Sequence, residues 1–131
     1  MYKWILAALL VATPVVADET WTNGFGDVIY EEDFETTALF SAASPDGTIW
    51  MYIDNLAGNY SMRDGIFTGV WLIEEDGFCG SSLIGEDGRG SNFWGTLELV
   101  WDNSGFPSGW SARLGDCGQI PFRTMRATPP Q

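Results

Sequence analysis

Short alternating segments separated by glycine- and aspartate-rich turns constrain the fold of this chain more than any other feature. In the clearest segment, one face is formed by Phe93, Gly95, Leu97, Leu99 and Trp101, and the other by Trp94, Thr96, Glu98, Val100 and Asp102. A two-residue period is the spacing of a β-strand with one buried face. We expect the first set to face the core.

The same reading divides most of the chain into strands. The segments expected to be strands are 28–34, 48–54, 58–62, 66–74, 79–84, 92–101, 110–114 and 120–125. Arg63-Asp64-Gly65 and residues 86–90 are expected to be hairpin turns, because Asp-Gly between apolar runs favours them. One short helix is predicted at 36–43, since Thr36 can cap its start and Ser44-Pro45-Asp46-Gly47 ends it.

Regularly spaced short strands predict an all-β domain. We expect a small antiparallel β-barrel or a two-sheet sandwich of about seven or eight short strands. Residues 66–73 are apolar on both faces, which favours a central strand covered by a loop, a helix or a partner. The chain resembles lipocalin- and avidin-like barrels in length and strand rhythm, a resemblance that implies a fold and no function. The tail from about residue 127 contains two prolines and is expected to fray.

The first residues have the pattern of a secretory signal peptide. Lys3 precedes an apolar run from Trp4 to Ala12, and Pro14 and the small Ala17 follow it. The run is shorter than the roughly 20 residues that span a bilayer. We expect residues 1–17 to be removed, which leaves one exported domain of 131 − 17 = 114 residues at 18–131, without a membrane span and with a periplasmic or extracellular destination, in a bacterium.

The chain has two cysteines, Cys79 and Cys117. In an exported protein two cysteines are most simply paired in a disulfide. Two cysteines without a histidine are too few ligands for zinc, which prefers four nitrogen or sulfur ligands, and redox pairs normally have only two residues between the cysteines. A structural disulfide is therefore predicted.

The charge of the chain excludes one class of partner. After removal of residues 1–17, which include the only lysine, five arginines face 18 acidic residues, so the side-chain balance is 5 − 18 = −13. Nucleic-acid binding depends on clustered cations, so we expect no nucleic-acid partner. The aromatic content is too high for acidic disorder, which indicates a packed core.

The absence of histidine restricts the chemistry available. Serine and cysteine nucleophiles activated by histidine are excluded, as are imidazole metal sites. Paired carboxylates can still hydrolyse glycosides, with Glu98 and either Glu74 or Glu31 as candidates. These glutamates are equally explained as solvated outward positions on strands. We predict that the chain is not an enzyme, with a carboxylate glycosidase as a remote alternative.

Calcium is the one cofactor that the acidic turns suggest. Calcium binds six to eight oxygens, often in acidic loops with glycine. Glu74, Asp76, Glu86 and Asp87 lie in two such turns and are the candidate ligands. Neither turn matches a helix-flanked calcium loop, so solvated hairpin turns are the competing interpretation.

Aromatic residues are the remaining functional signal. If Ile49 and the alternate positions after it face the core, then Trp50 and Tyr52 face outward, as Trp94 does. Tryptophan and tyrosine suit sugar rings or a protein partner, so these three residues are expected to form a ligand or partner surface. The competing interpretation is that they cover a second small core.

Together these features predict a non-enzymatic exported β-domain that binds a small molecule, a glycan or a protein. The alternatives are a carbohydrate-binding module and a secreted inhibitor or accessory subunit of an envelope complex.

Overall fold

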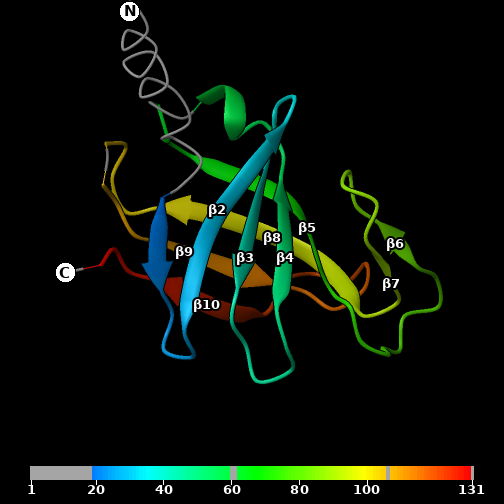
Figure 1. Ribbon diagram of the computed structural model, residues 1–131. Helices are drawn as coiled ribbons and strands as arrows, with labels where there is room; N and C mark the ends of the chain where they lie inside the picture. The colour runs from blue at the N-terminus through cyan, green and yellow to red at the C-terminus, as the bar shows by residue number, and fades with distance from the viewer. Residues whose placement is uncertain (1–18, 60–61, 106, 131) are drawn as a thin grey trace, which may run out of the picture.

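The computed structural model describes residues 19–59, 62–105 and 107–130, which form an all-β protein (Figure 1). Its elements are β1 (Thr20–Thr22), β2 (Asp27–Phe34), β3 (Thr37–Ala42), β4 (Ile49–Ile53), the short 3₁₀ helix η2 (Ala57–Asn59), β5 (Ile66–Ile73), β6 (Leu83–Ile84), β7 (Gly90–Ser91), β8 (Trp94–Trp101), β9 (Trp110–Leu114) and β10 (Arg123–Ala127). The expected leader, residues 1–17, lies outside the described residues. Within the described ranges, no helix has the length and apolar character needed to cross a membrane.

Eight strands form one antiparallel sheet in the order β1-β2-β3-β4-β5-β8-β9-β10. Each strand pairs with its neighbour in the chain, except where the β6–β7 hairpin is inserted between β5 and β8. The two edges of the sheet meet where Thr22 and Thr128 exchange two backbone hydrogen bonds of 2.9 Å. The molecule is therefore a nearly closed up-and-down barrel, one of the two predicted architectures.

Apolar side chains on the inner face of every main strand fill the barrel. The predicted inner face of 93–101 is confirmed, because Gly95, Leu97, Leu99 and Trp101 are buried and Phe93 packs against them. Other buried members of this core include Trp21, Val28, Tyr30, Phe40, Ile49, Met51, Ile53, Phe67, Trp71, Ile73, Trp110, Ala112 and Leu114. Burial of each large apolar side chain contributes about 1.5–3 kcal/mol, so this core is the main source of stability.

The predicted helix at 36–43 is wrong, because these residues form strand β3. Glu35 has a φ of 58°, and with Thr36 it makes a tight turn that pairs Phe34 with Thr37. Every residue of β3 is buried. Residues that are covered on both faces show no apolar–polar alternation, which is why the sequence pattern did not indicate a strand.

The predicted strand at 58–62 and its hairpin turn at 63–65 are also absent from the described residues. Ala57–Asn59 is η2, and β5 pairs with β4 and β8 instead. Arg63 is buried, with its guanidinium 3.8 Å from the Trp101 ring centre and 2.8 Å from a Glu19 oxygen. These contacts hold the connection between β4 and β5 against the end of the barrel, where Arg63 lies outside the strands.

The tail does not fray at residue 127. Ala127 is fully buried within β10, and Thr128 makes the backbone hydrogen bonds that join the two sheet edges. The two prolines at 129–130 follow the Thr22–Thr128 pair. Proline has no backbone N–H, and at this position beyond the strand no hydrogen bond within the sheet is lost.

The insertion between β5 and β8 forms a second, smaller layer on the outside of the barrel. We call residues 77–91 the outer segment; it contains β6 and β7, which pair with each other only (Figure 1). A strand was predicted over 79–84, but only Leu83–Ile84 is extended. The outer segment covers part of β4 and β5, so the prediction that strand 66–73 lies beneath another part of the chain is confirmed.

Candidate functional site

A disulfide joins Cys79 to Cys117, with their Cα atoms 5.5 Å apart, and confirms the predicted pairing. Cys79 lies in the outer segment and Cys117 in the loop between β9 and β10. The backbone supports the same contact, because the Cys117 amide donates to the Trp94 carbonyl at 2.8 Å and the Cys79 amide to the Asn92 carbonyl at 3.1 Å. The bridge fastens the outer segment to the barrel.

The three aromatic residues predicted as a ligand surface lie on the outer face of the barrel, but the chain covers them itself. Tyr52 is 1% exposed and therefore cannot contact a ligand, while Trp50 and Trp94 are half-buried. They pack with Leu39 and Leu72 in a second apolar cluster, and Leu83 of the outer segment lies on it. This placement matches the competing interpretation, a second small core.

The backbone of the outer segment packs directly on the side chain of Tyr52. A Cβ atom at Gly85 would lie 2.3 Å from Cζ of Tyr52, so only glycine lets the outer segment pack on the phenol ring. The Trp94 indole donates to the Ser81 carbonyl at 2.9 Å. Aromatic side chains and one glycine therefore position the outer segment.

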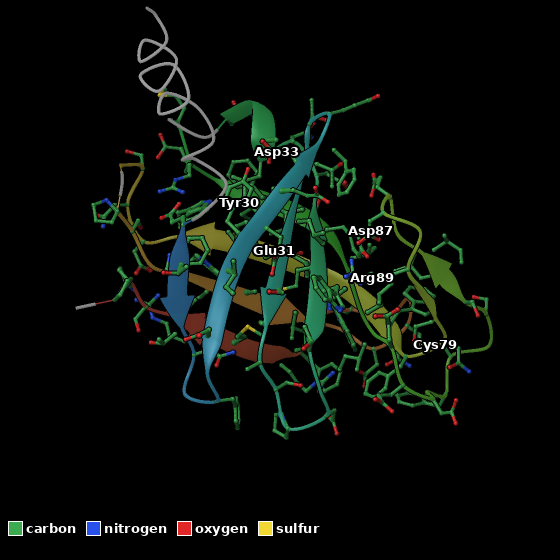
Figure 2. All side chains as sticks on the ribbon, in the orientation of Figure 1. Tyr30, Glu31, Asp33, Cys79, Asp87 and Arg89 are labelled. Atoms are coloured by element: carbon green, nitrogen blue, oxygen red, sulfur yellow. A yellow bond between two sulfur atoms is a disulfide. The ribbon has the colours of Figure 1, made fainter. Side chains whose placement is uncertain are left out.

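A polar network also attaches the outer segment to the barrel, and two of its members, Asp87 and Arg89, are labelled in Figure 2. The Tyr52 hydroxyl donates to Asp87 at 2.7 Å, and the Arg89 guanidinium pairs with Asp87 while lying 3.4 Å from the Trp50 ring centre. Burial and the neighbouring Asp87 raise the pKa of Tyr52 above its usual value. Partial burial opposes ionisation of Asp87, but hydrogen bonds from Tyr52 and Arg89 outweigh it and lower the pKa of Asp87.

The candidate calcium ligands have other roles. Glu74 lies 3.4 Å from Nε of Arg89, which also holds Asp87. Glu86 accepts a hydrogen bond of 3.3 Å from Thr37. Asp76 lines an open surface depression together with Glu74, Glu75 and residues 90–92. Within 19–59, 62–105 and 107–130, no group of three or more carboxylate or thiol side chains has the arrangement of a metal site.

The candidate catalytic glutamates are not brought together. Glu98 pairs with Arg113 on β9 at 3.6 Å, and Glu31 accepts a hydrogen bond of 2.7 Å from Ser41 on β3. Strands β3, β4 and β5 separate Glu31 on β2 from Glu98 on β8. Glu74 follows β5 and pairs with Arg89. The geometry therefore does not place two of these carboxylates on one cleft.

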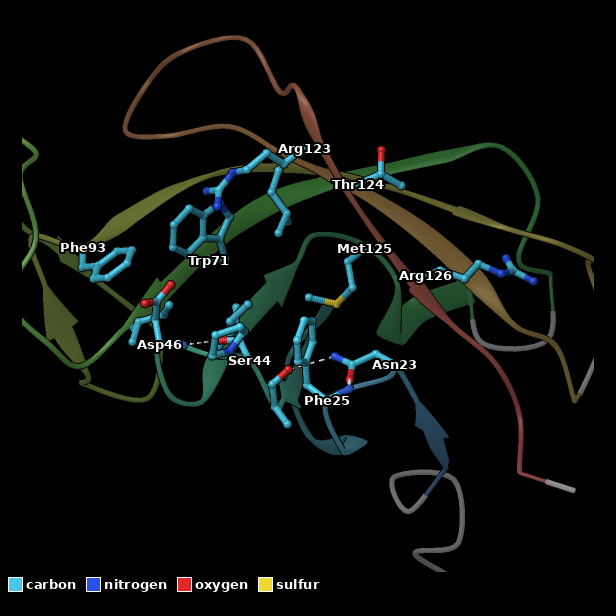
Figure 3. A pocket seen from close by; sticks show the side chains of 15 residues that line it. Asn23, Phe25, Ser44, Asp46, Trp71, Phe93, Arg123, Thr124, Met125 and Arg126 are labelled. Atoms are coloured by element: carbon cyan, nitrogen blue, oxygen red, sulfur yellow. Dashed lines mark hydrogen bonds between the residues drawn. The ribbon is translucent and has the colours of Figure 1, made fainter.

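A cavity lies instead at one end of the barrel, which we call the mouth. There the loops β1–β2 and β3–β4, the end of the β5–β8 connection and the strand β10 line an open cavity of about 290 Å³ (Figure 3). Its floor is the end of the core, formed by the buried side chains of Ile49, Trp71, Ile73 and Leu114. The floor is apolar because each of these residues faces inward from one of the two inner positions of its strand that lie nearest the mouth.

Aromatic and flexible apolar side chains form the walls of the mouth. Phe93 lies edge-on to Trp71, with ring centres 5.9 Å apart, and Met125 faces in from β10. Phe25 is 65% exposed at the rim. An apolar side chain so exposed beside an apolar cavity leaves surface available for a ligand.

One cation stands directly over this apolar floor. The Arg123 guanidinium is 5.8 Å from the Trp71 ring centre and 5.5 Å from that of Phe122, and it donates to Asp116 at 2.5 Å (Figure 3). The Trp71 indole is fixed beneath it, since it donates to the Gly115 carbonyl at 3.0 Å. These contacts preorganise Arg123 on the edge of the cavity.

Most of the other polar side chains of the mouth make hydrogen bonds that stabilise its loops. Asn23 donates to the Ala43 carbonyl at 2.9 Å and accepts from two backbone amides, and Ser44 donates to the Gly47 carbonyl at 2.6 Å. Asp46 is an exposed carboxylate in the β3–β4 turn. Arg126 pairs with Asp102 on the barrel exterior.

Sequence reasoning assigned the mouth residues to the core or left them without a role. The inward direction of Phe93 was predicted, whereas Trp71 lies in a segment predicted to be apolar on both faces. The convergence of these strand ends around a cavity was not predicted. A signal for Arg123 was present, because the alternation of Met125 and Ala127 places it on the inner face at the start of β10.

Fold and site together define a small all-β protein, a nearly closed eight-stranded barrel with a cavity of apolar floor at its mouth. Comparisons with protein-family models, with curated proteins and with solved structures found no match.

Proposed function

We propose that this chain is an exported, non-enzymatic binding protein that holds a small, mainly apolar ligand in the mouth of its barrel. The observation that carries the proposal is the cavity at the mouth, whose apolar floor is core and whose wall includes the exposed Phe25. Ligand sites are typically concave and apolar, with few polar groups that fix orientation. Arg123 and Asp46 supply those groups here.

The size of the cavity limits the ligand. Sites for drug-sized ligands occupy about 300–1,000 Å³, and an apolar cavity of about 150 Å³ already accepts benzene. A volume of about 290 Å³ therefore suits a molecule of one or two rings. The aromatic walls favour flat ligands, which can stack on or meet the ring edges of Phe25 and Phe93.

Export is supported by the leader pattern at 1–17 and by the disulfide, which persists in oxidising compartments. The non-enzymatic assignment rests on the absence of histidine and on the separation of Glu31 from Glu98. Of the aromatic surface first predicted, Tyr52 is inaccessible, so the mouth replaces that surface as the proposed site.

Titration of the oxidised protein with benzamide and 2-naphthamide tests this proposal. These uncharged ring compounds should bind with millimolar or tighter affinity, measured by calorimetry, and should quench fluorescence from Trp71. Phe25→Ala should weaken binding severalfold because it removes one wall. Ile120→Ala is the matched control, since Ile120 is 82% exposed and does not line the mouth. Equal loss in both variants, or no binding at all, would contradict the proposal.

A further inference from the structure

We propose that the ligand of the mouth is an aromatic carboxylate of one or two rings, whose ring occupies the cavity and whose carboxylate pairs with Arg123. This inference rests on the proposed function and adds the chemical class of the ligand. It starts from the fact that the mouth combines an apolar floor with Arg123, whose guanidinium lies 5.8 Å from the ring centre of the floor residue Trp71 (Figure 3).

Arg123 has donors to spare. A guanidinium carries five N–H donors in a rigid fork, and one Arg123 nitrogen donates to Asp116. The remaining donors stand beside the cavity, because Arg123 lines it. A carboxylate matches the fork in two parallel hydrogen bonds, which a neutral carbonyl cannot do.

The position of Arg123 is fixed before any ligand arrives. Asp116 accepts a hydrogen bond from the guanidinium, and the ring centres of Trp71 and Phe122 lie 5.8 and 5.5 Å from its central carbon. A preorganised side chain loses little conformational entropy on binding, so more of the interaction appears as affinity.

The competing charged group is Asp46, which would favour an amine. Asp46 is exposed at the tip of the β3–β4 turn. An ion pair at such an exposed carboxylate contributes little. The Arg123 side chain is 49% exposed and bears part of the same hydration cost, but its hydrogen bond to Asp116 and its position near the Trp71 ring already orient it. The chain as a whole is acidic and repels anions at long range, but physiological salt screens that field beyond about 8 Å. The short-range contact at Arg123 therefore decides the class of ligand.

Calorimetric titration with matched probes tests the inference. 2-Naphthoate should bind at least about tenfold more tightly than 2-naphthamide, as expected for a charge-assisted hydrogen-bonded pair. Benzoate and benzamide should show the same order. In Arg123→Gln the advantage of the carboxylate should fall below about threefold, while the amide should bind as it does to the wild type.

Arg113→Gln is the matched control. Arg113 lies on the neighbouring strand β9, pairs with Glu98 on the barrel exterior and does not line the mouth. It should keep the full advantage of the carboxylate. 2-Naphthylmethylamine tests the role of Asp46 and should bind more weakly than the amide.

Each outcome separates this inference from the proposed function. Equal affinity for carboxylate and amide would overturn the inference and leave the mouth as a neutral-ligand site. Tighter binding of the amine would overturn it in favour of Asp46, and a carboxylate advantage that persists in Arg123→Gln would overturn the role of Arg123. Failure of all probes to bind at millimolar concentration would overturn the proposed function, and the inference with it.

Discussion

Gly95 occupies the point where β8, β5 and the β9–β10 loop come together. A Cβ atom at this residue would lie 1.7 Å from the Gly115 carbonyl oxygen and 2.7 Å from Nε1 of Trp71. These two atoms are hydrogen-bonded to each other at 3.0 Å. The missing side chain thus lets a backbone carbonyl reach the indole that forms the floor of the mouth.

Gly95→Ala should therefore lower the free energy of unfolding by about 2–3 kcal/mol, because backbone must move to admit the methyl group. Urea unfolding measures the effect. Gly80→Ala is the control, since its Cβ would meet nothing within 4 Å, and it should change stability by less than about 0.5 kcal/mol. Equal losses in the two variants would contradict the steric explanation.

Tyr52 and Asp87 make stability depend on pH in two separate ranges. The pKa of Asp87 is lowered in the folded protein, so its contribution is present above the usual aspartate value of about 3.9 and is lost as the pH falls through the lower folded value. The pKa of Tyr52 is raised, so its contribution is present below about pH 10 and is lost as the pH rises further.

Replacing Asp87 by Asn should make the fall in stability between about pH 5 and about pH 2 shallower than in the wild type. Tyr52→Phe should cost about 1–2 kcal/mol at neutral pH, because Asp87 loses one buried donor but keeps Arg89. Urea unfolding at several pH values checks both. An acid profile identical in Asp87→Asn and wild type would show that this carboxylate is not linked to folding.

The outer segment shows what one disulfide does for an element with little regular structure. Its two strands contain two residues each and pair only with one another. Its attachment depends on the Cys79–Cys117 bond, on Tyr52 and Arg89 contacts, and on the Leu83 side chain. The outer segment and the disulfide together shield the apolar cluster around Leu72 from water.

Reduction of the disulfide should lower the free energy of unfolding by at most roughly 4 kcal/mol, the loop-entropy value for the 39 residues from Cys79 to Cys117. The folded, oxidised protein should show no titratable thiol. Trp50 and Trp94 should become more accessible to acrylamide after reduction, because the outer segment loosens. The Cys79→Ala, Cys117→Ala double variant should behave as the reduced protein does. An unchanged unfolding midpoint, or a free thiol before reduction, would contradict the structural role.

Sequence reasoning succeeded at the level of elements where one face of a strand is buried and the other is solvated. Strand β9 matches its predicted range, and the inner faces of β4 and β8 are confirmed. It failed at β3, where both faces are buried, and at Tyr52, whose outward face is covered by residues more than 30 positions away in the chain. Burial by residues that are distant in sequence is a tertiary contact, which the local apolar–polar pattern of a strand does not encode.

At the scale of the whole molecule, the barrel is held closed by a narrow seam. Thr22 and Thr128 supply two backbone hydrogen bonds, and no other ladder joins β1 to β10 within the described residues. Ala127, beside the seam, is fully buried. The all-β fold was predictable from the regular spacing of short strands. Closure of the barrel was not, because it depends on Thr128, which lies in a tail that was expected to fray on account of its two prolines.

Removal of residues 127–131 should therefore destabilise the protein by about 2 kcal/mol or more, because a buried residue and both seam hydrogen bonds are lost. It should also accelerate hydrogen exchange at the Thr22 amide. Removal of 129–131 alone is the control and should leave that amide protected. If both truncations exchange at the same rate, the seam does not close the barrel in solution.

The seam also sets an order of events during folding. Thr22 and Thr128 lie 106 positions apart, so the barrel stays an open sheet until the end of β10 has paired with β1. Until then both edges of the sheet carry unpaired backbone groups. The edge of a second copy can pair with these groups, so self-association competes with closure of the barrel.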